Sequence, residues 1–462
     1  MESSLLTLET LRKIGFAKYK IIFKKNGKCL LQSRNLLNFI VVDNYGLNIY
    51  KNIKQNDKQS RNHLSSFRNN PSLSRSIGPF IKQINIIKQN KNDFSLPKRN
   101  GLVLSLFLTM NCNHYCSYCI RDAGTSLNNE LSNKEWLVFS KEVEEAVKRY
   151  GIKRRDFRVH INGGEPTLSP SFLKLANSFI RMGAKIFIFT NGSRPEMIKK
   201  IGKNLTQLDG VQVSLHTLGP TFFNKETGKL KKHLLKAFDT ISYLINKNVS
   251  ITIVVMVSAQ NFKEICEKLC LILKKYILQP SKVEVALNLP TLRGRCTELD
   301  LPQTRYTMGR VSQQLRKIKD ELLESGFKEC HLMYSKNKPS PIYLTGRDCN
   351  YGHQINIFPN GDVSACEVPM EGLNIRNINF HDVLQEGFSY QEKYRFNKSP
   401  ACKVCSLKYV CGGGCRTQNY IFYGKVLRER CPQYFKNDIK NKLFVKLDSV
   451  FYANGKERKV NG

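Results

Sequence analysis

Three closely spaced cysteines are the residues of this sequence best suited to chemistry. Cys112, Cys116 and Cys119 have the spacing C-x3-C-x2-C and follow an apolar stretch, residues 102–109, that predicts a buried strand. Thiolates at this density suit zinc or an iron–sulfur cluster. A structural four-iron cluster takes four thiolates, so three would leave one iron open to bind a substrate or cofactor. The alternative is a zinc site made by the three cysteines and His114.

A second set of seven cysteines lies toward the C-terminus. Its members are Cys349, Cys366, Cys402, Cys405, Cys411, Cys415 and Cys431. Seven thiolates exceed the needs of one four-iron cluster and fall one short of the needs of two. Structural zinc is the alternative for this set.

The cysteine count and the charge balance bear on the compartment and the partners. The chain has 15 cysteines and no stretch that reads as a signal peptide, and clustered cysteines in a reducing cytosol more often bind metal than form disulfides. No apolar run reaches the length of a spanning helix, so we expect a cytoplasmic protein without a membrane partner. The net charge is +37, but the lysines are scattered. The scattered lysines favour a solvated basic surface. We find no stripe of alternating basic and aromatic residues of the kind that would predict nucleic-acid binding.

A repeated alternation of strands and helices surrounds the first cysteine motif. Helical periodicity follows most of the strands that apolar runs predict at residues 102–109, 157–162, 185–190, 211–216, 249–257 and 282–289. About six repeats indicate an α/β fold, a partial (β/α)6 TIM-type barrel. In such barrels the chemistry lies where strands end and the following loops begin, which is where the three-cysteine motif stands.

Changes in composition divide the chain into four parts. Residues 1–97 carry none of the clustered cysteines and hold three predicted strands, the first two joined by a turn at Asn26 and Gly27. We expect this part to be a small α+β domain with a linker. Residues 98–325 carry the barrel pattern, residues 326–435 are rich in cysteine, and residues 436–462 form a basic terminal helix and tail.

The first cysteine motif, with an aromatic residue before its last cysteine, resembles the radical S-adenosylmethionine (radical SAM) superfamily. The stretch NGGEP at residues 162–166, after the second strand, strengthens the resemblance. In that family the Gly163-Gly164-Glu165 segment contacts the methionine amine of SAM, and glycines allow such close backbone approach. The resemblance implies further cofactor contacts from Tyr118, Thr190, Asn191, Ser214 and Arg293.

Simpler interpretations of these residues stay open. Thr190 and Asn191 precede a glycine and make a good turn, Ser214 could be a buried hydroxyl, and Arg293 and Arg295 could be solvated loop arginines. The chemistry that the resemblance implies is a one-electron cleavage. SAM chelates the open iron of a [4Fe–4S] cluster, and a 5′-deoxyadenosyl radical then abstracts hydrogen from a substrate. A reductant such as flavodoxin or ferredoxin would supply the electron.

The seven C-terminal cysteines resemble the SPASM domain, which follows the barrel in many radical SAM enzymes. The resemblance implies two auxiliary [4Fe–4S] clusters, and therefore three clusters in the chain. The first auxiliary cluster would use Cys349, Cys366 and Cys415, and Cys330 is the candidate for an eighth ligand. The ligands of the second would be Cys402, Cys405, Cys411 and Cys431.

Members with SPASM domains mostly modify peptides, so the resemblance implies a peptide maturase. The N-terminal strands resemble the small winged-helix domain that recognises leader peptides, to which a peptide adds as a further strand. An acidic leader would suit the basic charge balance. We therefore expect a precursor peptide as the substrate and a thioether cross-link as the product.

Other functions are compatible with the same motifs. Carbon–carbon cross-linking is one, and oxidation of Cys or Ser to formylglycine, as in sulfatase-maturing relatives, is another. Glu367 stands where those relatives place an aspartate thought to act as the base, although a surface role is the alternative. A non-enzymatic iron–sulfur electron carrier is opposed by the retained Gly163-Gly164-Glu165 segment.

Overall fold

The chain divides into two compact units. The larger unit comprises residues 99–338 and 350–392, and the smaller unit comprises residues 1–98, 339–349 and 393–462. The structure, a computed structural model, describes residues 20–32, 39–42, 47, 51, 101–215, 227–333 and 354–444, except 367, 434, 438 and 442.

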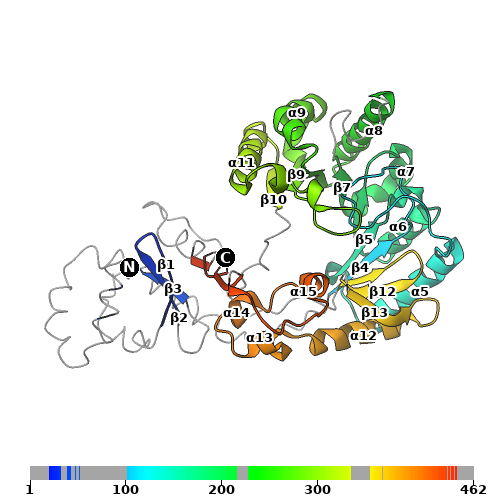
Figure 1. Ribbon diagram of the computed structural model, residues 1–462. Helices are drawn as coiled ribbons and strands as arrows, with labels where there is room; N and C mark the ends of the chain where they lie inside the picture. Colours follow the sequence, from blue (N-terminus) through cyan, green and yellow to red (C-terminus); the bar gives the residue numbers. More distant parts are fainter. Residues whose placement is uncertain are drawn as a thin grey trace, which may run out of the picture. The chain divides into compact units, whose positions relative to one another are not determined.

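A ten-stranded sheet forms the centre of the larger unit (Figure 1). Its order is β10-β9-β8-β7-β6-β5-β4-β11-β12-β13. Neighbours from β10 to β11 are parallel, and β11, β12 and β13 pair antiparallel. The strands are β4 (Leu102–Phe107), β5 (Phe157–Asn162), β6 (Lys185–Thr190), β7 (Leu208–Ser214), β8 (Ile251–Met256), β9 (Val283–Asn288), β10 (Glu329–Met333), β11 (Gln354–Ile357), β12 (Asp362–Ala365) and β13 (Val368–Asn374). The predicted α/β class with a parallel central sheet is confirmed, and the curved sheet is consistent with a partial barrel.

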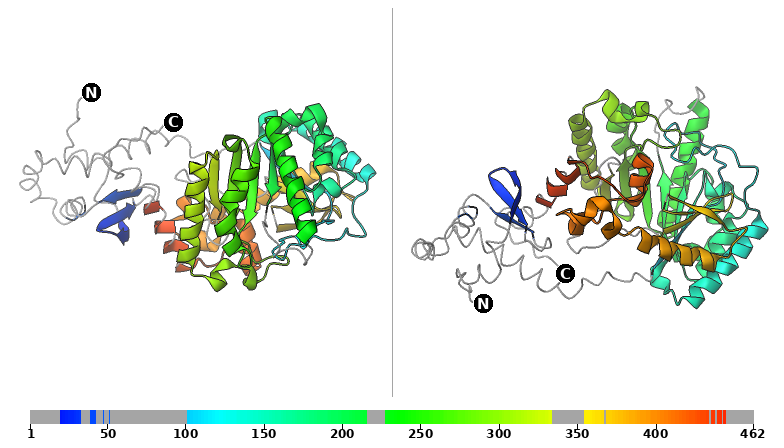
Figure 2. Two further views of the ribbon diagram at one scale, coloured as in Figure 1. Left: turned by 90° about the horizontal axis from the view of Figure 1, so that it is seen from above. Right: turned by 60° about the horizontal axis from the view of Figure 1, so that its bottom comes forward.

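Helices cover the outer face of this sheet (Figure 2). Phe157, Val159 and Ile161 of β5 are buried, and Phe157 meets Phe179 of α6 with ring centroids 6.4 Å apart. Alternate residues of β5 stay partly exposed, so the inner face is available for a site. The helices are α5 (Asn133–Arg149), α6 (Phe172–Arg181), α7 (Pro195–Lys199), α8 (Thr227–Asn246), α9 (Phe262–Tyr276), α10 (Pro302–Arg305), α11 (Met308–Glu324) and α12 (Phe380–Lys393).

The first helix after the cysteine motif begins at a hydrogen-bonded cap. The Ser132 hydroxyl accepts from Glu135 N at 3.3 Å, and Glu135 Oε2 accepts from Ser132 N at 2.7 Å. This reciprocal pair is a capping box, which satisfies amides that the first turn leaves unpaired. Trp136, Phe139 and Val143 then lie in the core at helical spacing.

The compact units divide the chain differently from the composition. The strands β11 to β13 and the helix α12 lie within the predicted cysteine-rich part, residues 326–435. All of these strands, and all of α12 except Lys393, nevertheless belong to the larger unit. The strand β11 joins the sheet by pairing in parallel with β4, the strand that leads into the cysteine motif. The sheet is thereby extended beside the first strand of the predicted barrel.

The smaller unit contains a three-stranded antiparallel sheet with the order β1-β2-β3. Asn26 and Gly27, with φ of 50° and 70°, form the turn between the first two strands, as the sequence predicts. The elements of this unit are β1 (Lys20–Lys25), β2 (Lys28–Gln32), β3 (Phe39–Val42), α13 (Pro400–Lys403), α14 (Lys408–Cys411) and α15 (Arg416–Tyr423).

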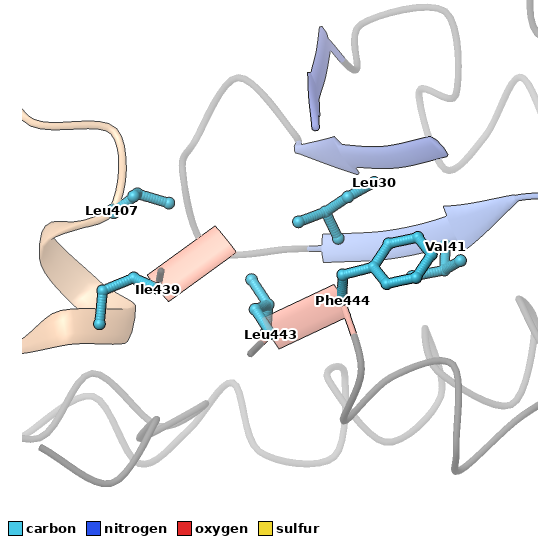
Figure 3. Close-up of a cluster of buried hydrophobic side chains, with 6 residues drawn as sticks. All are labelled: Leu30, Val41, Leu407, Ile439, Leu443 and Phe444. Carbon is cyan, nitrogen blue, oxygen red and sulfur yellow. The ribbon is translucent and has the colours of Figure 1, made fainter. Parts of the chain in front are cut away.

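An apolar cluster within the smaller unit joins its N-terminal sheet to its C-terminal segment. Cys405 and Cys411 pack against this cluster while partly exposed. Lys25 Nζ also donates to Asn441 Oδ1 at 2.8 Å. The first and last described parts of the chain therefore share one core. Figure 3 shows the buried members of the cluster, which are Leu30, Val41, Leu407, Ile439, Leu443 and Phe444.

Among the described helices, we find none with the length and apolar composition needed to cross a membrane.

We expect Leu30→Ala to loosen the C-terminal segment of the smaller unit. Leu30 is fully buried in the shared cluster, and such a truncation costs about 3 kcal/mol. Hydrogen exchange should become faster at the amides of residues 439–444. Val404→Ala removes an apolar side chain that is 91% exposed and serves as the control. Unchanged exchange in residues 439–444 of Leu30→Ala would contradict the shared core.

Candidate functional site

The three-cysteine motif lies on a closed loop at the C-terminal end of β4. Cys112 N donates to Gly124 O at 2.9 Å, and Gly124 N donates to Met110 O at 3.0 Å. These bonds join the two ends of the loop. Within it, Cys119 N donates to Cys116 O at 3.2 Å. The loop therefore has a defined shape before any metal is considered.

The three thiols of this loop share one neighbourhood. Burial, followed by the charges of Cys112 and Cys119, raises the pKa of Cys116 to about 12. Burial also raises the pKa of Cys112 to about 11, while His114 N donates to its sulfur at 3.4 Å. Among the described residues no three potential ligands already form a metal-binding group, so the thiols converge without standing at coordination distance. Soft thiols that repel one another as thiolates fit a cationic iron–sulfur core, which removes that repulsion.

The glycines after β5 press the backbone against the cysteine loop. Gly164 N donates to Thr109 O at 2.7 Å, and Glu165 N donates to Asn111 O at 2.8 Å. A Cβ atom at Gly163 would stand 2.9 Å from Thr109 O, and one at Gly164 would overlap Asn111 O. Only glycine permits this approach, which brings the predicted SAM-binding segment beside the cysteines.

Glu165 ties the end of β5 to the end of β6. Its side chain is fully buried, and Oε1 accepts from the hydroxyls of Thr167 at 2.6 Å and Thr190 at 2.7 Å. Oε2 accepts from Asn191 N at 2.7 Å. Burial raises the pKa of Glu165, and these hydrogen bonds oppose that rise. The resemblance implies a contact of this segment with the methionine amine, whereas in the structure the carboxylate is occupied by donors of the protein.

Asn113, inside the cysteine motif, links the motif to the turn after β6. Asn191 Nδ2 donates to Asn113 Oδ1 at 2.8 Å, and Asn113 Nδ2 donates to Ser193 Oγ at 2.8 Å. Asn191 and Thr190, both predicted cofactor contacts, are thus brought to the cysteine loop. The sequence analysis missed Asn113 and Ser193, because a single amide or hydroxyl in a variable motif position carries no pattern.

Three further predicted cofactor contacts lie around the same loops. Tyr118 is 3% exposed, and its interaction with the Cys116 thiol lowers the pKa of that thiol. Ser214, at the end of β7, is half-buried and lies on the opposite side of the strand from the buried Val213. Arg293 is half-buried in the segment after β9, and the structure brings its neighbour Arg295 onto the cysteine loop.

A polar group that the sequence analysis missed lies on the inner face of the sheet. His160 of β5 faces the Ser105 hydroxyl of β4 at 3.5 Å, and Gln354 Nε2 of β11 donates to that hydroxyl at 3.3 Å. Burial lowers the pKa of His160 to about 4, so its imidazole is neutral near pH 7. The three residues lie on three neighbouring strands, and only the sheet order reveals that they meet.

Four cysteines of the C-terminal set gather in the smaller unit. Burial, followed by the charges of Cys402 and Cys431, raises the pKa of Cys411 to about 12, and Cys405 contributes in the same direction. Burial raises the pKa of Cys402, with Cys405 and Cys431 adding to the rise, and burial also raises the pKa of Cys431, with Cys405 adding to it. These four are the predicted ligands of the second auxiliary cluster, and their convergence fits a second iron–sulfur centre.

A run of three glycines lets the main chain turn tightly around these four cysteines. Gly412, Gly413 and Gly414 have φ of 58°, 78° and 77°, a left-handed run that favours glycine at each position. Arg428 Nη1 lies 3.9 Å from the Cys431 sulfur, and its charge lowers the pKa of that thiol. A cation beside the thiols favours their ionised form, as metal binding requires.

The predicted ligands of the first auxiliary cluster are only partly described. Cys349 and Glu367 lie outside the described residues. Cys366 directly follows β12 in the larger unit and has φ of 53°, and Cys415 precedes α15 in the smaller unit. The assignment of this cluster, and of Glu367 as a base, stays a prediction.

Cys330, the candidate eighth ligand, lies on β10 and is 1% exposed. It pairs with Val285 of β9, a fully buried residue, so its side chain belongs to the layer between sheet and helices. The charges of Lys319 and Asp320 on α11 influence the Cys330 pKa, and the charge of Cys330 in turn raises the pKa of Cys270 on α9. This placement lends no support to a ligand role.

Comparison with known proteins identifies the domain that carries the first site. Residues 106–269 match the Radical SAM superfamily. The chain contains a radical SAM domain. The matched region includes the cysteine loop, the two glycines and Glu165.

Characterised relatives of the radical SAM domain differ in how much of their length is matched. The probable GTP 3′,8-cyclase of Thermococcus kodakarensis is 34% identical over 131 residues, which is 27% of this chain and 38% of that protein. The mycofactocin maturase MftC of Mycolicibacterium smegmatis is 24% identical over 332 residues, covering 69% of this chain and 79% of that protein. The chain thus spans well under half of the cyclase and most of the maturase.

A solved structure shows the same fold over a longer stretch. The crystal structure of Streptococcus suis SuiB is 16% identical to this chain, with a TM-score of 0.50. The superposition covers 90% of this chain and 98% of SuiB. At this identity the similarity shows the fold alone.

We expect Glu165→Gln to destabilise the radical SAM domain by about 2 kcal/mol, because an amide nitrogen would face donors that a carboxylate oxygen now accepts. Urea unfolding under anaerobic conditions measures the change. Glu144→Gln, whose parent side chain is 44% exposed on α5, is the control. Wild-type stability combined with weakened SAM binding would contradict the structural role and favour a direct contact with the cofactor.

Proposed function

We propose that this chain is a radical SAM peptide maturase that abstracts hydrogen from a precursor peptide. The observation that carries the proposal is the meeting of three loops at the C-terminal ends of β4, β5 and β6. They bring together the crowded thiols around Cys116, the closely packed glycines 163 and 164, and the turn after Thr190. This edge of a parallel barrel is where such folds hold their chemistry.

The side chains at this edge fit a [4Fe–4S] cluster and SAM. Cys112, Cys116 and Cys119 would hold the cluster through three irons. When bound, the cluster and SAM would supply one electron and a carbon radical that abstracts hydrogen. The chain itself would position these groups: Asn113 and Glu165 fix the loops, and the glycines leave room for the methionine end of SAM.

The C-terminal cysteines support two auxiliary clusters as part of the proposal, giving three [4Fe–4S] clusters in total. The second auxiliary cluster would be held by the four cysteines that the smaller unit gathers, Cys402, Cys405, Cys411 and Cys431. The first would rely on Cys349, Cys366 and Cys415. Because Cys330 faces the helix layer, this cluster would keep an open iron unless another ligand occupies it.

The substrate class rests on the N-terminal sheet and on the similarity to one relative, a mycofactocin maturase. The sheet ends in edge strands, and a leader peptide could add to one of them. The net charge of +37 would speed encounter with an acidic leader. We infer a thioether cross-link as the product, formed in the cytoplasm with flavodoxin or ferredoxin as the reductant.

The proposal is tested by anaerobic reconstitution with iron and sulfide, followed by SAM, dithionite and a precursor peptide encoded beside this chain. We expect about twelve irons per chain, release of 5′-deoxyadenosine, and a peptide that has lost two hydrogens. Cys116→Ala should abolish 5′-deoxyadenosine release while keeping the iron of the auxiliary clusters. Cys266→Ala, which changes a cysteine on α9, is the control and should behave as wild type.

Two results would contradict different parts of the proposal. A protein that holds zinc and no iron would overturn the radical SAM chemistry. A peptide in which one Cys or Ser has become formylglycine would keep that chemistry and replace cross-linking with sulfatase-type maturation.

A further inference from the structure

The segment after β9 is bound to the cysteine loop through one arginine. Arg295 Nε donates to Cys116 O at 3.0 Å, and Nη2 donates to Ala123 O at 2.8 Å. Nη1 forms an ion pair with Asp122 at 2.7 Å. The main chain adds a fourth bond, because Arg295 N donates to Cys119 O at 3.0 Å. One residue thus contacts the loop at both cysteines of its tightest turn and at its closing end.

The Tyr115 ring also holds the Arg295 side chain in this position. Its guanidinium carbon lies 3.9 Å from the centroid of the Tyr115 ring, and its side chain is only 13% exposed. Tyr115 itself is 74% exposed, and its ring stacks on the outer side of the arginine side chain. A guanidinium stacked on a ring and directed at three acceptors has little freedom to turn toward another ligand.

The rest of the segment is shaped for the same contact. Gly294 has φ of 61°, and a Cβ atom there would overlap Cys119 O and stand 2.8 Å from Ile120 O. At the far end of the segment, Asp300 is 3% exposed and accepts from the Ser117 hydroxyl at 2.8 Å. Arg295 and Asp300, both in the segment after β9, therefore each bind the cysteine loop.

We propose that Arg295 is a positioning residue that holds the three-cysteine loop in its cluster-binding shape and places a fixed positive charge beside the cluster. The inference rests on the proposed function, because it requires a cluster in this loop. A planar fork reaches three acceptors at once, which a lysine ammonium cannot do. A nearby cation stabilises the reduced, more negative cluster and so raises its reduction potential.

Arg293 was the predicted cofactor contact, and the spacing of the two arginines alone could not distinguish it from Arg295.

The experiment compares Arg295→Lys, Arg295→Gln and Arg181→Gln in the reconstituted full chain. Arg181 is exposed at the end of α6 and is the control. The cluster of interest is identified by the electron paramagnetic resonance signal that changes when SAM is added. Two quantities are measured on that signal: the rate of its loss to an iron chelator and its midpoint potential.

Geometry and charge give different expected results. Arg295→Lys keeps the positive charge and loses the planar guanidinium that reaches three acceptors. Its signal should be lost to the chelator about tenfold faster, while its midpoint potential should stay near that of wild type. Arg295→Gln loses both, so the decay should be faster and the potential more negative. Arg181→Gln should match wild type in both measurements. Failure of both Arg295 variants to take up this cluster, with the auxiliary signals intact, would support the same role.

The outcomes separate this inference from the proposed function. If wild type shows a SAM-responsive signal and both Arg295 variants match it in decay rate and potential, the role of Arg295 is wrong and the proposed function stands. If wild type shows no SAM-responsive signal, the proposed function fails and this inference fails with it.

Discussion

The crowding of three thiols in one short, closed loop is the constraint on which this structure depends. Ionised thiolates repel one another, and burial raises the pKa of Cys112 and Cys116 further. These thiols therefore stay protonated near pH 7, and a cationic centre would be needed to hold them together as thiolates. The surrounding architecture supplies hydrogen bonds to this loop and to its neighbours from several directions.

Those supports come from loops that are distant in sequence. The carboxylate of Glu165 joins the ends of β5 and β6, and Asn113 joins the cysteine loop to the turn after β6. Arg295 holds the loop from the segment after β9. The parallel sheet makes this possible, because it delivers the carboxyl ends of all these strands to one edge. The fold thus positions a reactive loop without placing it on a helix or strand.

The sequence predicted the elements that have local patterns. The strands β5 and β6 occupy the predicted residues 157–162 and 185–190, and Ser132 caps the predicted helix. The addition of β11 beside β4 was not predictable, because long-range pairing leaves no local signal. The same limit applied to the site: the cysteines and glycines were found by spacing, whereas the tie made by Glu165 and the choice of Arg295 over Arg293 required three-dimensional contacts.

We propose that the loop of Cys112, Cys116 and Cys119 holds a cluster with one open iron that binds SAM. Pulsed electron–nuclear double resonance on the reduced protein, with SAM carrying 15N in its amine, tests this binding. We expect a nitrogen coupling to the cluster that disappears in Cys116→Ala. Cluster spectra of the reduced protein that do not change when labelled SAM is added would show that SAM does not bind the cluster.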